Sequence, residues 1–266
     1  TATPITFITI TNPVDGTQTV YYSTTATSAE LDPETGVPEG SDWTQADSDD
    51  FVSVTNPTLA GYSVISNNAP ASDLVHVASQ TVTNTSDDLN YTVVYAPAYT
   101  VSSTKTVNET INYVDQNGKT IANSYTATPI TFITITNPVD GTQTVYYSTT
   151  ESGQPTLDNN GVPVGDWTRG NSTYFAAIIN PSVIGQHVVS TTDPSNDLTQ
   201  TTVKSIDSNS DNFDFTVTYT PNQEAANVTY IDDTTGKTLS TKDLTGDYGS
   251  TDPYRTGDTI ADYEKQ

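Results

Sequence analysis

The hydrophobic and polar residues of this chain alternate most regularly between residues 213 and 219. Every second residue of that stretch is hydrophobic, and these residues are Phe213, Phe215, Val217 and Tyr219. Successive side chains of a β-strand point to opposite faces, so the pattern predicts a strand with one face in the core and one in water. The same period occurs earlier in the chain, at Leu89, Tyr91, Val93 and Tyr95. Different residues with one period indicate two copies of the same fold.

Shorter patterns predict further strands and turns. Residues 107–114 predict a strand that enters a tight hairpin at 116–118 (Gln-Asn-Gly), because Asn-Gly favours the positive φ angles of a type I′ turn. Residues 137–141 predict a turn, and residues 142–147 predict the strand that returns from it. Residues 173–179 are the one plausible helix, and the same apolar block fits a buried strand equally well. The predicted fold class is therefore mainly β, with little helix.

The chain contains an internal repeat. The 25 residues at 1–25, TATPITFITITNPVDGTQTVYYSTT, return unchanged at 126–150. Beyond this copied run the two halves still align, at an offset of 124 residues after a one-residue gap, and Trp43 pairs with Trp167. A period of this length suits a domain that folds by itself, so we expect tandem domains rather than a solenoid.

The hydrophobic alternation slips inside the copied run. Ile130 and Phe132 follow one phase, whereas Ile133 and Ile135 follow the other. A β-bulge would produce this slip, and so would a long strand that leaves one sheet for another. The other aligned segments differ between the repeats, so perfect identity exceeds what the fold requires and indicates recent duplication or exchange.

The repeat frame predicts three domains. Residues 1–98 form a first repeat that lacks its N-terminal hairpin, and residues 99–221 form a complete second repeat. Residues 222–266 begin a third, truncated module, because NVTYIDDTTGKTL within them is similar to TINYVDQNGKTI in the second repeat. We expect an unpaired sheet edge in the first repeat. We also expect poor packing in the last 45 residues, which are too few to bury a core.

Composition narrows the function classes. Only 33% of the residues are hydrophobic, and 32 acidic residues against 8 basic ones give a net charge of −24. A disordered chain can have this composition, but the regular alternation and the 16 tyrosines favour folded β-domains. A chain without a basic stripe does not hold nucleic acid by counterion release, and anionic membranes repel it. Cysteine is absent, so neither a disulfide nor a thiolate metal site can form.

No motif of the chain predicts catalysis. The two Gly-Lys-Thr tripeptides, at 118–120 and 236–238, lack the upstream glycine of a phosphate loop. The two histidines, His76 and His187, do not align between the repeats, and a zinc site would need both of them. We therefore expect surface histidines and no enzyme.

One segment has the oxygen spacing of the first half of a calcium loop. Asp207, Asn209 and Asp211 stand at every second position, as calcium ligands do in such loops. The sixth position is Asn212 instead of glycine, and the closing glutamate is missing. A polar turn is the favoured interpretation, Ca²⁺ is the alternative, and no other cofactor is expected.

Six aromatic residues are the candidate ligand contacts: Tyr21, Tyr22, Trp43, Tyr146, Tyr147 and Trp167. Aromatic rings stack on sugars and anchor protein partners, and core packing is the competing interpretation for each tryptophan. Adjacent residues of a strand point to opposite faces, so one ring of each tyrosine pair is expected to be exposed.

Several longer strings match a known family. VNETINYVDQNGKTIANSYTATPITFITIT, followed by DWT, YFAAIINPSVIGQHVV and FTVTYTP, resembles the B2-type modules of lactobacillal mucus-binding proteins. The tail that begins VTYIDDTTGKTL is similar to the start of the mucin-binding (MucBP) module of the same proteins. The resemblance covers essentially the whole chain. It implies tandem β-grasp (ubiquitin-like) modules, elongated like beads on a string. It also implies an extracellular, cell-wall-anchored surface protein of Gram-positive bacteria, with its signal and anchor outside this segment.

The resemblance also implies a function. It implies a non-catalytic adhesin fragment that binds the carbohydrate of mucin glycoproteins through repeated weak contacts, with avidity supplied by repetition. Two alternatives stay open: spacer repeats that hold a distal binding domain away from the cell wall, and modules that bind immunoglobulin or another protein. Neither nucleic acid nor direct membrane contact is expected.

Overall fold

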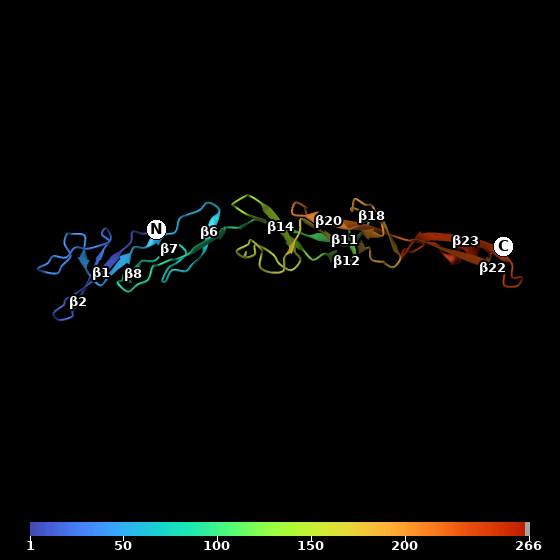
Figure 1. Ribbon diagram of the computed structural model, residues 1–266. Coiled ribbons are helices and arrows are strands. Elements are labelled where there is room, and N and C mark those ends of the chain that lie inside the picture. Colours follow the sequence, from blue (N-terminus) through green and yellow to red (C-terminus); the bar gives the residue numbers. More distant parts are fainter. Residues whose placement is uncertain (264–266) are drawn as a thin grey trace. The chain divides into compact units, whose positions relative to one another are not determined.

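Two compact units make up the computed structural model, which describes residues 1–263. The first unit contains residues 1–100, 136–143 and 156–163, and the second contains residues 101–135, 144–155 and 164 onwards. Both units consist of β-strands joined by turns, and the one helix of the described residues is α1 (Thr256–Tyr263) (Figure 1). The mainly β fold class is confirmed, whereas α1 was not predicted from the sequence.

The first unit is built from one three-stranded sheet and three strand pairs. The sheet has the order β1-β2-β3, with bounds Thr6–Thr11, Gln18–Ser23 and Thr44–Gln45. The pairs are β4 (Ser48–Phe51) with β8 (Gln80–Thr83), β5 (Val54–Thr55) with β7 (His76–Val77), and β6 (Tyr62–Asn67) with β9 (Val93–Pro97).

The second unit has two four-stranded sheets. One has the order β10-β13-β14-β15, with bounds Thr100–Val107, Ile130–Thr136, Gln143–Ser148 and Thr168–Arg169. The other has the order β12-β11-β21-β18, with bounds Thr120–Thr126, Glu109–Asp115, Phe213–Pro221 and Gln186–Thr191. Three strand pairs complete the unit: β16 (Ser172–Phe175) with β20 (Lys204–Asp207), β17 (Ile178–Ile179) with β19 (Gln200–Thr201), and β22 (Gln223–Ile231) with β23 (Thr238–Asp247).

The strands recur at the spacing that the sequence repeat predicts. Strands β3 to β8 of the first repeat correspond one by one to β15 to β20 of the second, and each starts 124 residues earlier. The pairings correspond as well, because β4 pairs with β8 as β16 pairs with β20. The two repeats therefore share one fold. The three domain boundaries drawn from the sequence stay a prediction.

A parallel strand pair lies at the centre of the second four-stranded sheet. Strand β11 runs parallel to β21, with Ile111 opposite Phe215 and Tyr113 opposite Val217. Antiparallel neighbours β12 and β18 flank the pair. The alternating strand expected around residue 215 is thus confirmed, and its buried face is Phe215, Val217 and Tyr219. A β-grasp fold also needs a helix on the sheet. The described chain has none between residues 101 and 221, so that part stays a prediction.

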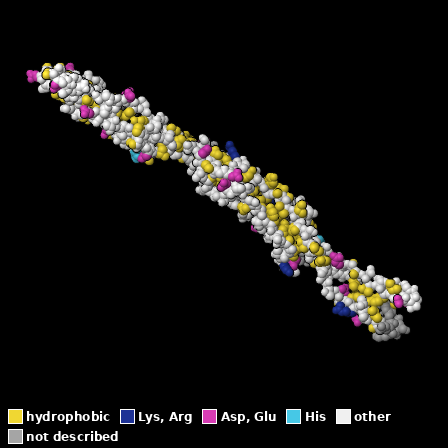
Figure 2. Space-filling model, turned by 90° about the horizontal axis from the view of Figure 1, so that it is seen from below, with side chains coloured by type: hydrophobic (Ala, Val, Ile, Leu, Met, Phe, Trp, Pro, Cys, Tyr) yellow, Lys and Arg dark blue, Asp and Glu magenta, His cyan; other side chains and the backbone are white. Residues whose placement is uncertain are grey.

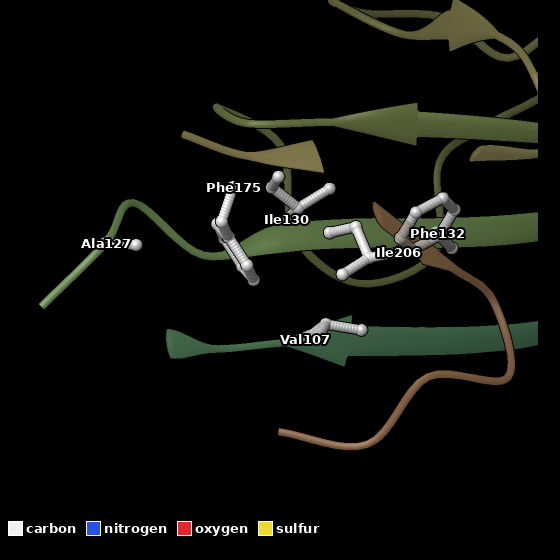
Figure 3. Close-up of a cluster of buried hydrophobic side chains, with 6 residues drawn as sticks. All are labelled: Val107, Ala127, Ile130, Phe132, Phe175 and Ile206. Carbon is white, nitrogen blue, oxygen red and sulfur yellow. The ribbon is translucent and has the colours of Figure 1, made fainter. Parts of the chain in front are cut away.

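Two clusters of buried hydrophobic side chains form the core of the second unit. The first cluster, shown in Figure 3, consists of Val107, Ala127, Ile130, Phe132, Phe175 and Ile206. The second consists of Ile111, Tyr113, Phe215, Val217 and Tyr219. The half-buried Phe213 packs against both, with its ring centroid 6.3 Å from that of Phe175 and 5.9 Å from that of Phe215. Phe213 therefore joins the two clusters into one core.

The predicted hairpin at residues 116–118 forms, but the type I′ turn was wrong. A type I′ turn needs positive φ at two residues, and here Gly118 alone has it, at 79°. The Asp115 carboxylate accepts hydrogen bonds from the backbone N–H groups of Asn117 (2.8 Å) and Lys119 (2.9 Å). These bonds hold a three-residue loop in which only the glycine is left-handed. Val107, expected in the hairpin strand, belongs instead to β10.

The apolar block at 173–179 is extended rather than helical. It contains the end of β16 and all of β17, so the strand interpretation was right, but the burial was wrong, because Tyr174 is 63% exposed and Ile179 is 79% exposed. The slip in the hydrophobic alternation of the copied run also reflects burial. Ile130, Thr131, Phe132 and Ile133 are all buried, so both faces of strand β13 carry core side chains. In the first copy, β1 and β2 pair without a register shift, so no bulge accounts for the slip there. Burial on both faces of β13 explains the slip in the second copy.

The first repeat has open sheet edges, as predicted. Strand β21 pairs with both β11 and β18, whereas the corresponding β9 pairs only with β6 among the described residues. Strand β1 likewise pairs only with β2. In the last module, none of the described side chains from residue 222 onwards is buried, which agrees with the expected poor packing. No helix of the described chain is long and apolar enough to span a membrane.

Candidate functional site

The predicted tyrosine pairs lie on β2 and β14, and neither pair presents a fully exposed ring. Tyr21 and Tyr146 are each only 8% exposed. Their neighbours Tyr22 and Tyr147 are half-buried, because Tyr22 packs on Phe7 with ring centroids 6.1 Å apart, and Tyr147 packs on Phe132 at 5.9 Å. The expectation of one outward ring in each pair was therefore wrong, since the outer ring is covered on one side by the neighbouring strand.

The structure brings each tryptophan to the tyrosine pair of its own repeat. Trp167 immediately precedes β15, which pairs with β14 so that Thr168 lies opposite Tyr147. Trp43 has the same place beside β2 in the first repeat. Both indoles are half-buried. The six predicted aromatic residues thus form two equivalent groups, one in each repeat, and each group has one partly accessible tyrosine and one partly accessible tryptophan.

Polar side chains surround Trp167 in the second repeat. Thr150 Oγ1 donates a hydrogen bond to Asp166 Oδ2 (3.1 Å), and the Asp166 backbone N–H donates to Glu151 Oε1 (3.3 Å). The bend that presents these groups is fixed by Ser148, whose buried hydroxyl accepts from the backbone N–H groups of Thr150 (3.1 Å) and Glu151 (2.9 Å). We call Thr150, Glu151, Asp166 and Trp167 the tryptophan rim.

The indole N–H of Trp167 has no hydrogen-bond partner within residues 1–263, although the atom is buried. A donor in that position is satisfied in most proteins. Gly165, at φ +120°, packs closely beside this donor, because a Cβ there would come within 3.0 Å of Glu151 Oε1 and 3.4 Å of Trp167 Nε1. The tryptophan rim therefore combines an aromatic face, an unpaired donor and carboxylate acceptors, which is the chemistry that recognises a hydroxyl-rich ligand.

The first repeat has a simpler version of this rim. Ser23 makes the same bend and Asp42 stands at the position of Asp166, but Ala26 occupies the position of Glu151. The sequence analysis selected Trp167 but missed the acidic side chains beside it. The first difference after the copied run, Ala26 in the first repeat and Glu151 in the second, could have indicated Glu151.

A separate cavity of about 540 Å³ lies in the first repeat between the β1–β2 turn and the segment 33–37. Tyr21 lines it together with Asn12, Thr17 and Glu34. A predicted contact residue thus reaches a polar-lined space even though little of its surface is exposed.

Acidic side chains dominate the charged surface. Figure 2 shows Asp and Glu scattered over the visible face, with Lys and Arg in only a few places. Several turn aspartates accept hydrogen bonds that favour their charged form. The backbone N–H and hydroxyl of Thr142 lower the pKa of Asp140, and those of Thr17 lower the pKa of Asp15. The surface therefore stays strongly negative at neutral pH.

The candidate calcium residues form a polar turn. Asp207 Oδ1 accepts hydrogen bonds from the Asn209 backbone N–H (2.8 Å) and from Ser210 Oγ (3.2 Å). Asp211 is 99% exposed, and Lys105 Nζ lies 3.7 Å from its Oδ1. A carboxylate occupied by its own turn and another beside an ammonium fit a calcium loop poorly. Among the described residues, no group of three or more His, Cys, Asp or Glu side chains could hold a metal ion.

Two protein-family models together match nearly the whole chain. The family model described as the Muc B2-like domain matches residues 5–99 and 98–223, and the model described as a mucin binding domain matches residues 223–266. Neither family is described as catalytic. No curated protein matches the chain.

Three solved structures illustrate its structural neighbours. The crystal structure of Mub-RV is 21% identical, with 72% of this chain and 95% of that one covered and a TM-score of 0.30. The type 2 repeat of the mucus binding protein MUB from Lactobacillus reuteri is 22% identical, with coverages of 72% and 96% and a TM-score of 0.28. The mucin-binding domain of Spr1345 from Streptococcus pneumoniae is 19% identical, with coverages of 46% and 94% and a TM-score of 0.28.

Proposed function

Because the chain belongs to the Muc B2-like domain family, we propose that it is a non-catalytic part of a cell-surface adhesin that binds the glycans of mucin. The match of residues 223–266 to a mucin binding domain supports mucin as the partner. An adhesin of this kind works outside the cell, so the proposal includes an extracellular, cell-wall-anchored location.

The unpaired indole N–H of Trp167 is the observation that carries the carbohydrate part of the proposal. A buried donor without a partner favours a ligand that brings an acceptor, such as a sugar ring or hydroxyl oxygen. The indole face can stack on the apolar face of the same sugar, while Glu151 and Asp166 accept hydrogen bonds from its hydroxyls.

The charge of the chain narrows the kind of sugar. Exposed charges interact over a Debye length of about 8–10 Å at physiological salt, so a chain of net charge −24 repels sialylated or sulfated ends of a glycan. The tryptophan rim itself contains two carboxylates. The proposed ligand is therefore a neutral, hydroxyl-rich sugar of the mucin chains.

Each contact of this size is weak, and repetition supplies the affinity. The chain has two tryptophan positions, Trp43 and Trp167, which immediately precede the corresponding strands β3 and β15 of the two repeats. When both engage one mucin molecule, the second contact forms at a high effective concentration.

Retention of the 266-residue chain on immobilised mucin, before and after enzymatic deglycosylation, tests the proposal. We expect deglycosylation to abolish retention. Trp167→Ala should weaken retention roughly tenfold, the effect of a contact worth about 1.4 kcal/mol. Tyr174→Ala is the matched control, because this tyrosine is 63% exposed on β16 and should contribute nothing.

The other outcomes identify the alternatives. Equal retention on deglycosylated mucin would contradict glycan binding and point to a protein ligand, which a pull-down of immunoglobulin from serum would reveal. No retention on either surface, and no immunoglobulin captured, would favour spacer repeats.

A further inference from the structure

A buried polar cluster lies inside the second repeat, away from the tryptophan rim. Asp193 stands in the loop after β18, Lys204 opens β20, and Glu109 opens β11. Asp193 and Glu109 are completely buried, and the Lys204 side chain is only 13% exposed. Three ionisable side chains inside a β-domain are costly unless each is paired or does chemistry.

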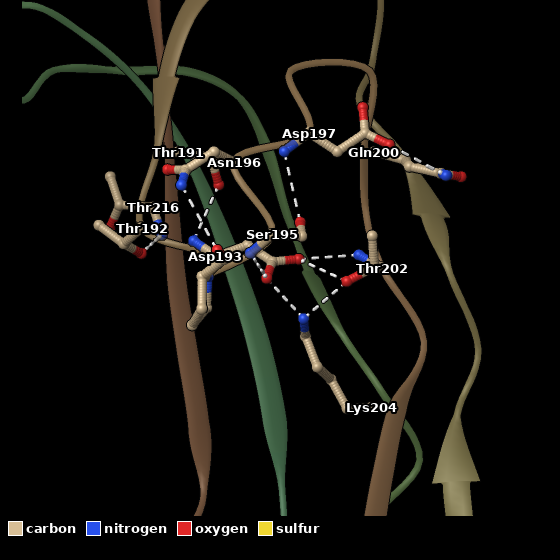
Figure 4. Close-up of polar contacts among 11 residues, drawn as sticks. Thr191, Thr192, Asp193, Ser195, Asn196, Asp197, Gln200, Thr202, Lys204 and Thr216 are labelled. Carbon is tan, nitrogen blue, oxygen red and sulfur yellow. Dashed lines mark hydrogen bonds and ion pairs between the residues drawn. The ribbon is translucent and has the colours of Figure 1, made fainter.

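The Asp193 carboxylate and the Lys204 ammonium are held in direct contact, as Figure 4 shows. Lys204 Nζ lies 2.5 Å from Asp193 Oδ1 and 2.8 Å from Thr202 Oγ1. Oδ1 also accepts from the Ser195 backbone N–H at 3.0 Å. The other oxygen, Oδ2, accepts from the backbone N–H (2.8 Å) and Oγ1 (3.2 Å) of Thr202. Hydrogen bonds thus hold both reacting groups in direct contact, which favours a reaction between them.

Glu109 is the unexplained member of the cluster. Neither of its carboxylate oxygens has a hydrogen-bond partner within residues 1–263. Its side chain lies on the same face of β11 as Ile111, whose partner across the parallel pair is Phe215. Lys204 Nζ lies 5.0 Å from the centroid of that Phe215 ring, so Glu109 and the ammonium approach the same core. Burial raises the pKa of Glu109, and the charges of Lys204 and Asp193 act on it as well.

We propose that Lys204 and Asp193 become joined by an intramolecular amide bond between Nζ and Cγ, formed without another enzyme, with Glu109 as the proton relay. The observations that carry this are the clamped Nζ–carboxylate contact and a buried carboxyl group that has no structural partner. A plain ion pair accounts for Asp193 and Lys204, but it leaves Glu109 unexplained.

The step balances without any added reactant. In the dry core, proton transfer from Nζ to the carboxyl groups yields a neutral amine and a neutral acid. The Nζ lone pair attacks Cγ of Asp193, and the N–H and Oγ1 of Thr202 stabilise the negative charge that develops on Oδ2. The Cγ–Oδ1 bond breaks, and Oδ1 leaves as water with two protons that came from Nζ. Glu109 passes these protons on and ends in its original state.

The first repeat serves as an internal comparison. At the offset of 124 residues, Ala69 replaces Asp193 and Gln80 replaces Lys204. The Gln80 amide donates instead to the carbonyls of Pro70 and Ala78, each at 3.1 Å. One bond per chain is therefore expected. Since the chain has no cysteine, this bond would provide a covalent tie that no disulfide can.

The intact mass of the denatured 266-residue chain tests the proposal. We expect a mass lower than that of the sequence by one water molecule, and a branched peptide joining Asp193 to Lys204 after proteolysis. Lys204→Arg keeps the positive charge and should restore the full mass. This variant excludes dehydration at Asp-Gly sites such as Asp15-Gly16, which would persist in it.

Two further variants test the chemistry. Asp193→Asn should lose one ammonia instead of one water, because the leaving group is then the amide nitrogen. Glu109→Gln should keep the full mass, whereas Glu109→Asp should regain part of the loss if the residue relays protons rather than fills space. A wild-type chain of full mass would overturn the bond, and unchanged water loss in Glu109→Gln would overturn the relay.

Discussion

Glu109 and Phe213 lie opposite each other where the parallel strands β11 and β21 begin. Residues 104 positions apart in the sequence are therefore direct neighbours in one sheet. Strand β11 lies near the start of the second repeat and β21 lies at its end, so the first and last parts of the repeat pair with each other. Its stability should depend on the side chains that this pairing buries.

Removing a buried side chain from β11 should strongly destabilise the second repeat. Ile111 is completely buried in the core cluster with Phe215 and Val217, so Ile111→Ala should cost about 2–5 kcal/mol through lost burial and the cavity left behind. Urea unfolding measures this loss. Ile184→Ala is the control, because Ile184 is 84% exposed and should change stability by less than about 0.5 kcal/mol. Equal effects of the two variants would contradict the assigned core.

The buried hydroxyl of Tyr219 should make the second repeat sensitive to alkali. Tyr219 donates to the Pro181 carbonyl at 2.6 Å, and burial raises its pKa from 10.0 to about 12. The folded state thus holds this proton more tightly than the unfolded chain. The stabilisation it gives is complete below pH 10 and is lost as the pH rises towards 12.

Tyr219→Phe should remove this alkaline loss and cost roughly 1–2 kcal/mol at neutral pH, because the Pro181 carbonyl loses its donor. Tyr95 makes the same bond to Pro57 at 2.7 Å in the first repeat, so Tyr95→Phe is the matched control. Thermal unfolding at a series of pH values measures both effects. An unchanged alkaline profile in Tyr219→Phe would refute the assignment.

The hydrogen-bonded aspartates should make the fold sensitive to acid. Their pKa values are lowered from 3.8 by bonds made only in the folded state, as for Asp140 with Thr142. The stabilisation is present above pH 3.8 and is lost as the pH falls through the lower folded-state values. These aspartates should therefore leave the melting temperature unchanged between about pH 5 and 7 and lower it below about pH 4, whereas Glu109, with its raised pKa, acts in the opposite direction above pH 4.5. A decline already at pH 6 would point to other groups.

Mucin retention should increase on mild acidification. Protonation of carboxylates near pH 4–5 weakens the repulsion between this chain and acidic mucin, so we expect more retention there than at pH 7. The relief is only partial because seven aspartates outside the buried cluster have lowered pKa values and stay charged in this range: Asp15, Asp32, Asp73, Asp140, Asp158, Asp197 and Asp232. If retention stayed constant or fell between pH 7 and pH 4, charge repulsion between the chain and mucin would not be what limits binding.

Removal of calcium should leave the fold unchanged. The Asp207 carboxylate accepts hydrogen bonds from its own turn, and the Lys105 ammonium lies beside the Asp211 carboxylate. A chelator should therefore not shift the melting temperature, and millimolar Ca²⁺ should not raise it. Asp207→Asn, which keeps the turn acceptor and removes the charge, gives the comparison. A rise with Ca²⁺ that this variant abolishes would establish the calcium site instead.

The sequence predicts the parts of this fold that depend on local patterns. The alternation at Phe215 and Val217 predicts β21, and the pairing of Trp43 with Trp167 predicts the correspondence of β3 with β15. These succeed because strand periodicity and repeat alignment need no knowledge of long-range contacts. The block at 173–179 stayed ambiguous, since short apolar runs have no distinctive period.

Predictions that depend on tertiary contacts were weaker. The covering of Tyr22 by Phe7 and of Tyr147 by Phe132 comes from strand pairing, which a two-residue pattern does not report. The turn at Gly118 is set by the Asp115 carboxylate rather than by the Asn-Gly dipeptide. The tryptophan rim and the buried cluster of Asp193 and Lys204 likewise join segments that carry no motif of their own.

The parallel pairing of β11 and β21 also determines how the second repeat would respond to a pulling force. Tension that enters at the start of β11 and leaves at the end of β21 drives the two strands past each other along their length. The hydrogen bonds between them would then be loaded together in shear, rather than broken one after another as in an unzipping hairpin. A protein that holds a bacterium to mucus under flow would gain mechanical resistance from this arrangement.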